Sequence, residues 1–413
     1  MFDLIVRNAY LRGRDGVWDI AIKGEHIQAI ERQIVADAPL ADVGGCIVLP
    51  GFCDTHVHLD KACLLDRCGH DHATLADAIA AVSELKSGFD VQDVYDRGAR
   101  CLDRAIVQGT SHMRTHVEID RRIGLRSFEA IRQLKRDYAW AIDLSICVFP
   151  QEGLFNNPGT EALLIEALEA GADLVGGCPY TDTEPQAHIT RIFDLAQRFD
   201  VDIDFHLDFD LDPRWMHLDA VLHETDVRRY GGRVAAGHAT KLSALKPESL
   251  AAITKRLAAA GVAVTALPST DLFLTGREHT ENVPRGIAPV HRLARGGVCC
   301  SIATNNVLNP FTPFGDLSLL RMANLYANVC HAGPAEFDTV LDLVTESPAR
   351  LLRLQGYGIK AGAFADLVVL DAPNQVEALG ALAQPLFALK RGKRTFTQER
   401  PVLLRPDQTR TAF

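Results

Sequence analysis

Long apolar runs and clusters of basic residues are both missing from this sequence of 413 residues. No apolar stretch reaches the roughly 18 to 20 residues that a membrane span requires, so we expect no membrane contact. The formal net charge is -10 and the Lys and Arg residues are dispersed, which argues against nucleic acid as a partner. Charged residues interrupt the apolar ones in segment 1–16, which predicts a strand and a turn rather than a signal peptide.

Paired cysteine motifs are missing as well. The ten cysteines are scattered along the chain and form no CxxC pair, so neither a thiolate metal site nor a Cys/His nucleophile is indicated. Isolated cysteines of this kind are typical of buried free thiols in a reducing compartment. We therefore expect a cytoplasmic protein.

The sequence does contain one repeating pattern of segments between residues 49 and 354. A short apolar run rich in β-branched residues, a polar loop and a stretch with helical spacing follow one another repeatedly. Eight runs have the length of strands: 47–55, 110–116, 141–149, 174–178, 202–207, 234–237, 262–267 and 298–303. Alternating strands and helices predict a parallel sheet, and eight units close it. We predict an α/β protein with a (β/α)₈ TIM barrel.

The two ends of the chain follow a different pattern. Residues 1–46 and 356–413 contain period-2 runs such as DLIVRNAYL and ADLVVLDA, which are typical of half-buried strands. We expect strands from both termini to pair in a small β-sandwich. The predicted domains are a β-sandwich of residues 1–48 plus 356–413 and a barrel of residues 49–355.

Histidines gather at the ends of the predicted barrel strands. The first strand ends in DTHVH, residues 54–58, and alternate residues of a strand point to one side, so His56 and His58 can reach one ion. Three further histidines follow other predicted strands: His116, His206 and His238. Because barrel enzymes keep their sites at the carboxyl ends of the strands, these five residues predict an active-site face.

Several segments resemble the amidohydrolase superfamily, and within it the branch of cytosine deaminase and N-isopropylammelide amidohydrolase. The matching segments are VLPGFCDTHVHLD (49–60), MRTHVEID (113–120), VFPQEGLF (148–155), GADLVGGCP (171–179), DFHLD (204–208), GHATKL (237–242), LPSTDLFLTGR (267–277), NNVLNPFTPFGD (305–316) and GIKAGAFADLVVLD (358–371). They follow the order and spacing of the family over nearly the whole chain.

The resemblance implies a site built around one divalent metal ion, with zinc or iron the main candidates. It implies that His56, His58 and His206 bind the metal and that His238 assists the metal-bound water. It also implies that Gln151 holds the edge of a planar heterocycle, because a primary amide donates and accepts at once. In such sites metal hydroxide attacks an sp² carbon that carries a nitrogen leaving group.

The chain departs from the family pattern at two positions. Phe209 stands where the family's deaminases carry a proton-transferring Glu, and Asn305 stands where they carry a metal-binding Asp. An amide is no base, so we assign Asn305 to substrate binding. Asp271 is our first candidate for the missing carboxylate and Asp208 our second; Asp210 and Glu118 are further candidates. Each is also explained as a turn, cap or loop residue.

Two basic residues are candidates for an anionic substrate or product. Lys61 follows HLD, and Arg277 lies in LTGR; we include Arg277 among the substrate-binding residues. Residues of this kind are more often members of structural ion pairs than ligand contacts.

The sequence therefore predicts a metal-dependent hydrolase that cleaves a C–N bond of a small nitrogen heterocycle. A deaminase and a cyclic amidohydrolase fit equally, because both use the same attack. The alternative, which Phe209 and Asn305 favour, is a catalytically impaired barrel that binds a metal or heterocycle without turnover. A purely structural barrel explains the histidines least well, and a homo-oligomer remains open.

Overall fold

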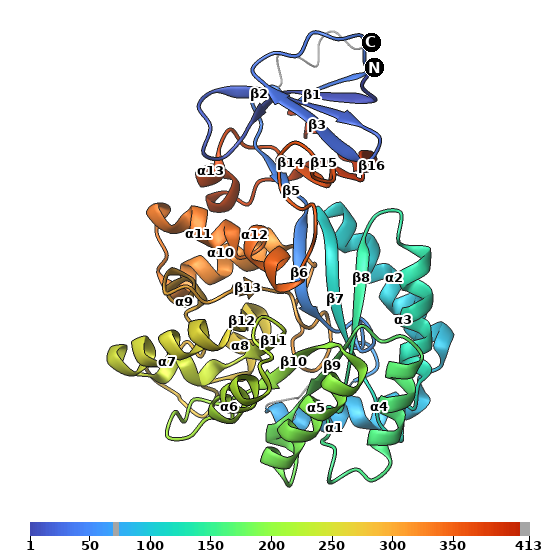
Figure 1. Ribbon diagram of the computed structural model, residues 1–413, viewed down its shortest axis with the longest axis vertical. Helices are drawn as coiled ribbons and strands as arrows, with labels where there is room; N and C mark the ends of the chain where they lie inside the picture. Colours follow the sequence, from blue (N-terminus) through green and yellow to red (C-terminus); the bar gives the residue numbers. More distant parts are fainter. Residues whose placement is uncertain (69–73, 405–413) are drawn as a thin grey trace.

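The structure, a computed structural model, describes residues 1–68 and 74–404. Its larger part is an eight-stranded parallel barrel with helices around it, and two four-stranded sheets lie at one end (Figure 1). The predicted α/β fold class, a TIM barrel with small accessory sheets, is confirmed. The last residues of the predicted sandwich segment, 405–413, lie outside the described residues.

The barrel strands follow one another around the sheet in sequence order, from β6 to β13. They are β6 (Phe52–Val57), β7 (Thr110–Glu118), β8 (Asp143–Phe149), β9 (Leu174–Gly177), β10 (Asp202–Leu207), β11 (Val234–His238), β12 (Val262–Ala266) and β13 (Cys300–Ile302). Each of the eight predicted runs contains or overlaps one of them. Asn305 closes the barrel beyond β13, because its N–H donates to the His56 carbonyl at 2.8 Å and its carbonyl accepts from His58 N–H at 2.9 Å.

Helices connect the barrel strands and cover their outer side. They are α1 (Leu75–Leu85), α2 (Val91–Val107), α3 (Arg126–Asp137), α4 (Thr160–Glu169), α5 (Pro185–Phe199), α6 (Leu218–Arg228), α7 (Pro247–Ala260), α8 (Pro268–Leu274), α9 (Val290–Arg295), α10 (Leu319–Cys330), α11 (Phe337–Asp342) and α12 (Glu346–Leu351), with short 3₁₀ turns η1 (Lys86–Gly88), η2 (Pro179–Thr181), η3 (Thr240–Ala244) and η4 (Pro334–Glu336). Among the described residues, none of these helices combines the length and apolar character needed to cross a membrane.

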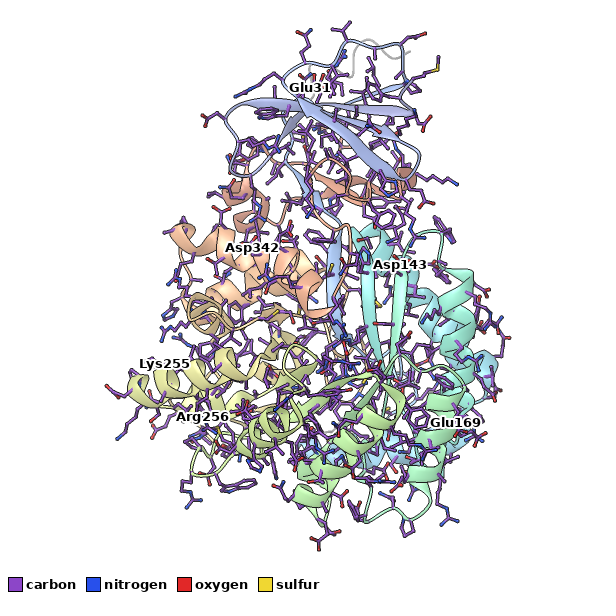
Figure 2. The ribbon with its side chains drawn as sticks, in the orientation of Figure 1. Glu31, Asp143, Glu169, Lys255, Arg256 and Asp342 are labelled. Atoms are coloured by element: carbon purple, nitrogen blue, oxygen red, sulfur yellow. The ribbon has the colours of Figure 1, made fainter. Side chains whose placement is uncertain are left out.

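Helix α7 shows why these segments pack as they do. Ile253 and Leu257 are one helical turn apart and are buried against the barrel. Lys255 and Arg256, on the opposite face, are exposed and extend from the edge of the molecule in Figure 2.

The terminal segments form two separate sheets that share one core. The first sheet has the order β3-β2-β1-β4 and the second β16-β15-β14-β5. Their strands are β1 (Leu4–Tyr10), β2 (Val17–Lys23), β3 (His26–Glu31), β4 (Leu40–Asp42), β5 (Val48–Pro50), β14 (Leu367–Leu370), β15 (Pro385–Lys390) and β16 (Lys393–Thr397), and α13 (Gln375–Gly380) lies between β14 and β15. Val6 and Ile20 of one sheet share a buried cluster with Val48 and Leu367 of the other.

The first predicted barrel strand, 47–55, was wrong as a single strand. It is two strands in two sheets, since β5 pairs with β14 while β6 pairs with β7. The chain changes sheets at Gly51, where a Cβ atom would lie 2.4 Å from the Ser111 hydroxyl oxygen. Only glycine allows this close approach of the backbone, and an apolar run across it hides the break.

A buried lysine joins the small sheets to the barrel. Nζ of Lys390, the last residue of β15, donates to Asp143 at 2.7 Å and to Asp366 at 2.8 Å. It also donates to the Ser111 carbonyl at 3.1 Å. Asp143 begins β8 at the end of the barrel that faces the small sheets (Figure 2). This junction fixes the amino ends of the strands and leaves their carboxyl ends for the site.

Candidate active site

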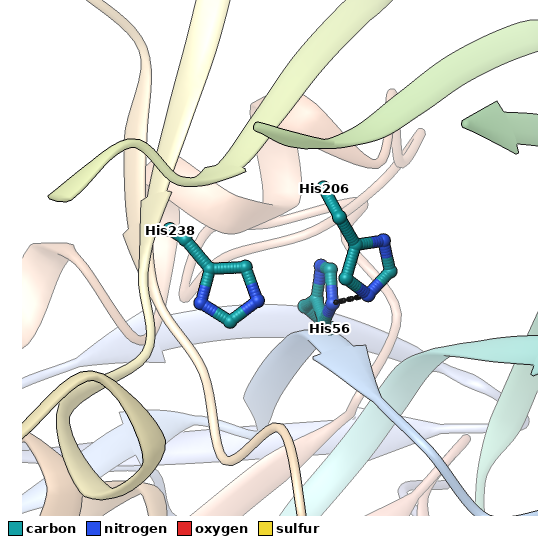
Figure 3. Close-up of side chains that lie close together, drawn as sticks. All are labelled: His56, His206 and His238. Carbon is teal, nitrogen blue, oxygen red and sulfur yellow. Dashed lines mark hydrogen bonds between the residues drawn. The ribbon is translucent and has the colours of Figure 1, made fainter. Parts of the chain in front are cut away.

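Three imidazole nitrogens meet at the carboxyl ends of β6 and β10. His206 Nε2 lies 3.1 Å from His56 Nε2 and 3.0 Å from His58 Nε2. All three side chains are buried. His238, the last residue of β11, extends toward the same point (Figure 3), and one ligand atom each of His56, His206 and His238 lies within 4.8 Å of the others.

This histidine cluster fits a first-row divalent metal ion. Burial, reinforced by the neighbouring histidines, holds the pKa of His56, His58 and His206 well below the usual value. The rings are therefore neutral and offer a lone pair. Two ligands of a tetrahedral zinc ion with Zn–N bonds of about 2.0–2.1 Å stand about 3.3 Å apart. The two observed spacings, from His206 Nε2 to His56 Nε2 and to His58 Nε2, are close to that value. An all-imidazole donor set suits such ions.

His238 forms a buried pair with Asp271. Its Nδ1 lies 2.6 Å from Asp271 Oδ1, and the second carboxylate oxygen accepts the Leu267 N–H at 2.9 Å. Asp271 lies in the first turn of α8, directly after β12. Burial raises the pKa of Asp271, whereas His238 and the Leu267 N–H act in the opposite direction. With Nδ1 facing the carboxylate, Nε2 is the ring nitrogen left for chemistry.

The two departures from the family pattern both lie beside the cluster. The Phe209 ring packs edge-on against the His238 ring, with centroids 4.5 Å apart. Asn305 has a left-handed backbone (φ 61°) and bridges the backbones of His56 and His58. Its side-chain amide is buried, and neither amide atom has a hydrogen-bond partner in the described part of the chain.

A small cavity opens beside the histidines. His58, His206 and His238 line it together with Lys61 and Gln151. Lys61 Nζ donates to Gln151 Oε1 at 2.9 Å, so these two predicted residues contact each other. The free volume is ≈ 10 Å³, room for about one water molecule. A ligand larger than water would therefore need lining side chains to move.

A larger cavity of ≈ 170 Å³ lies at the opposite end of the barrel strands. Asp202 and Val234, the first residues of β10 and β11, line it, and no histidine does. The size of a cavity does not by itself identify an active site. We place the candidate site at the histidine cluster because barrel enzymes keep their active sites at the carboxyl ends of the strands.

The structure places the other candidate carboxylates away from the histidine cluster. Asp208 accepts the backbone N–H groups of His217 and Leu218 and so caps α6. Glu118 pairs with Lys86 at 2.5 Å and lies 3.9 Å from Nζ of Lys61, which lines the cavity. Asp210, half-exposed, pairs with Lys241 at 3.1 Å. A role for Asp208 in catalysis stays a prediction, and its contacts here are structural.

Arg277, the predicted substrate contact, is exposed. Its Nε donates to the Phe273 carbonyl at 2.8 Å, and its guanidinium lies over the Phe273 ring. It does not line the cavity beside the histidines.

Sequence reasoning missed two residues beneath the cluster, Asp204 and Arg114. Each lies two positions before a cluster-face histidine on its strand, Asp204 before His206 and Arg114 before His116. Since alternate residues of a barrel strand share one side, that spacing was the available signal. These residues were missed because a charged side chain deep in a barrel needs a charged partner, and the sequence does not show that Asp204 and Arg114 lie together.

The fold and this cluster define a TIM-barrel enzyme with a histidine-rich candidate metal site at the carboxyl ends of its strands. A sequence profile described as the amidohydrolase family matches residues 128–386, and the chain belongs to that family. The predicted superfamily membership is therefore confirmed.

Three relatives illustrate the match. N-isopropylammelide isopropyl amidohydrolase of Pseudomonas sp. (strain ADP) is 29% identical over 406 residues, covering 95% of this chain and 96% of the relative. Pterin deaminase of Rhizobium rhizogenes (strain K84 / ATCC BAA-868) is 30% identical over 366 residues, covering 87% and 82%. The crystal structure of 5-methylcytosine deaminase from Klebsiella pneumoniae with 5-fluorocytosine superposes with a TM-score of 0.93 at 29% identity, covering 98% and 100%.

These relatives agree on a broad class of chemistry. They are named as amidohydrolases or deaminases. The fold shared with the 5-methylcytosine deaminase structure extends over almost the whole of each chain. The protein is accordingly a hydrolase that acts on carbon–nitrogen bonds other than peptide bonds.

Proposed function

We propose that this protein uses one divalent metal ion to hydrolyse an exocyclic or ring C–N bond of a small nitrogen heterocycle that carries a ring carbonyl. The observation that carries this proposal is that His56 Nε2 and His58 Nε2 each lie within 3.1 Å of His206 Nε2. A divalent ion held there would lower the pKa of a bound water toward neutrality and polarise the bond under attack. The three relatives are named for N-isopropylammelide, pterin and 5-methylcytosine, all of them nitrogen heterocycles.

His238 is the general base and acid in this proposal. Its Nδ1 is committed to Asp271, so Nε2 accepts the proton of the attacking water and later returns it to the departing nitrogen. Asp271 does not line the cavity. It holds the imidazole of His238 in one tautomer and stabilises the imidazolium that forms. The His238–Asp271 pair thereby takes the place of the glutamate that Phe209 replaces.

Lys61 and Gln151 supply the polar contacts for the substrate. The buried Lys61 ammonium donates to Gln151 at 2.9 Å and lies 3.9 Å from a Glu118 carboxylate oxygen. With three N–H donors, it can also donate to an oxygen of the substrate. Apolar and aromatic side chains form much of the rest of the cavity, among them Phe209 and Phe311, which suits a planar ring. A ring carbonyl beside a ring N–H matches this arrangement, and it favours oxo-substituted rings over purely amino-substituted ones.

A substrate screen tests the proposal. Protein loaded with zinc or iron is incubated with oxo- and amino-substituted triazines, pyrimidines and pterins, and with hydantoins for ring opening. Release of ammonia or alkylamine, or a loss of ring absorbance, should appear with at least one oxo-substituted ring. The His238→Gln variant should bind metal equally and turn over 10²–10⁴-fold more slowly, roughly the range for a general base.

Two outcomes would overturn the proposal. Turnover that persists in protein stripped of metal would remove the metal from the mechanism. Binding of heterocycles without turnover, by metal-loaded protein, would instead support the impaired barrel that Phe209 and Asn305 suggest.

A further inference from the structure

Four polar side chains are buried together directly beneath the histidine cluster. Asp204 is fully buried on β10, and its Oδ2 accepts from Arg114 Nη1 at 2.8 Å. His116 Nε2 lies 3.6 Å from the same oxygen, and His56 Nδ1 lies 3.8 Å from Asp204 Oδ1. The His116 and His56 rings stack with centroids 3.7 Å apart.

Several atoms of this group lack hydrogen bonds. Asp204 Oδ1, His56 Nδ1 and both nitrogens of His116 have no partner among the described residues. Unsatisfied buried polar atoms are rare and require a physical explanation. A second metal ion is one explanation, since His56, His116 and Asp204 offer three ligand atoms within 4.8 Å. The Arg114 guanidinium already neutralises the carboxylate at 2.8 Å, however, and would repel a second cation.

The orientation of His56 points to a different role. Its Nε2 faces His206 in the metal cluster, and its Nδ1 therefore faces the barrel interior and Asp204. Nδ1 of His58 and of His206 also lacks a partner, but no carboxylate lies within 4 Å of either ring in residues 1–68 and 74–404. His56 is thus the cluster ligand with an acidic residue on its far side.

We propose that Asp204 is a positioning residue that holds the proton of His56 on Nδ1 and so keeps the Nε2 lone pair for the metal. A carboxylate behind a metal-binding histidine fixes its tautomer and raises its basicity. The Arg114 guanidinium, 2.8 Å from Asp204 Oδ2, holds the carboxylate in place, and His116 packs against the face of the His56 ring. This inference rests on the proposed function, since it assumes that His56 binds a metal.

The experiment measures zinc affinity of the full chain, by competition with a colorimetric chelator on metal-free protein. Asp204→Asn keeps the size of the side chain but weakens the acceptor, and should raise the zinc Kd about 10- to 100-fold. The matched control is Asp182→Asn, which disrupts another buried Asp–His pair, with His188 at 2.8 Å, on elements outside the cluster. Its zinc Kd should stay within about twofold of the starting value.

Cobalt substitution supplies a second readout. The visible spectrum of the cobalt form reports the ligand set, and it should keep the same band pattern in Asp204→Asn because all cluster ligands remain. If Asp204→Asn does not purify folded, Asp204→Ser, which leaves room for a water beside Arg114, is measured in the same way.

Each outcome has one meaning. A weaker zinc Kd in the Asp204 variant alone supports the positioning role. An unchanged Kd in a folded Asp204 variant overturns it, as does an equal loss in Asp182→Asn. If the unmodified protein binds no divalent ion at all, the proposed function itself fails, and that result is distinct from a failure at Asp204.

Discussion

His238 Nδ1 and Asp271 Oδ1 lie 2.6 Å apart, and both side chains are buried. The two residues come from the carboxyl ends of neighbouring strands, β11 and β12. A phenyl ring such as that of Phe209 neither accepts nor donates a proton. In the proposed mechanism, proton transfer is therefore assigned to the imidazole of His238, which Asp271 orients.

The pair predicts a large kinetic effect for Asp271→Asn. An amide is a poor partner for an imidazolium and allows the wrong tautomer of His238, so kcat should fall about 10²–10⁴-fold. Metal content should not change, because Asp271 contacts no residue of the His56–His58–His206 set. Steady-state kinetics and elemental analysis on the same sample check both statements.

A double variant of His238 and Asp271 is the control for the predicted fall in kcat. Because they act as a unit, the double variant His238→Gln/Asp271→Asn should be about as slow as His238→Gln alone. Losses that multiply in the double variant would show that Asp271 acts independently of His238.

Lys61 is expected to act in substrate binding. Lys61→Met keeps a long side chain but removes the ammonium group, which lies over the Phe311 ring. A hydrogen bond to a charged donor contributes about 1.5–3 kcal/mol, so kcat/KM should fall about 10- to 100-fold. Most of this change should appear in KM. Lys255→Met, at the exposed face of α7 in Figure 2, is the matched surface control. A Lys61 variant with normal KM and reduced stability would make Lys61 structural.

Asn305 should limit metal affinity. Its buried amide has no partner and bridges the backbones of His56 and His58, so Asn305→Asp adds an anionic oxygen beside a site made of neutral rings. Zinc should bind about tenfold more tightly, by a rough Coulomb estimate for a partly screened charge. Chelator competition measures the change. A variant that is less stable and binds zinc no better would place this side chain outside the reach of the metal.

Much of this site could be predicted from the sequence, because a (β/α)₈ barrel requires a repeating pattern of strand and helix segments. Apolar runs located the eight barrel strands, although the first run also included β5 of the small sheets. Histidines at the strand ends marked the face where His56 and His206 meet. The sequence could not show which carboxylate serves His238, since Asp208 and Asp271 both follow strands and only packing directs one to α6 and the other to the imidazole. It also could not show the break at Gly51, because a close backbone contact leaves no trace in hydrophobicity.

Acid should destabilise the junction between barrel and small sheets through His112. Burial, with the Lys390 ammonium as a second cause, lowers the pKa of His112 to about 4. The unfolded chain takes up this proton near pH 6.5, about the ordinary value. Between these pH values the unfolded state binds more protons, so the free energy of unfolding decreases as pH falls, by about 2–3 kcal/mol for this residue at pH 4.5.

The His112→Gln variant isolates that contribution. Urea unfolding at pH 7.5 and pH 4.5 should show a smaller loss of stability in the variant, by about 2–3 kcal/mol, because glutamine does not titrate. Equal losses in both proteins would mean that His112 is protonated in the folded state.

Metal content per chain is the most direct test of the central claim, that His56, His58 and His206 form a metal centre. Protein purified without chelators, and its His56→Ala variant, are compared by elemental analysis. We predict about one zinc or iron ion per chain, lost in the variant while the fold is retained. Less than about a tenth of an ion in the unmodified protein, with none regained on reconstitution, would contradict a metal-dependent hydrolase.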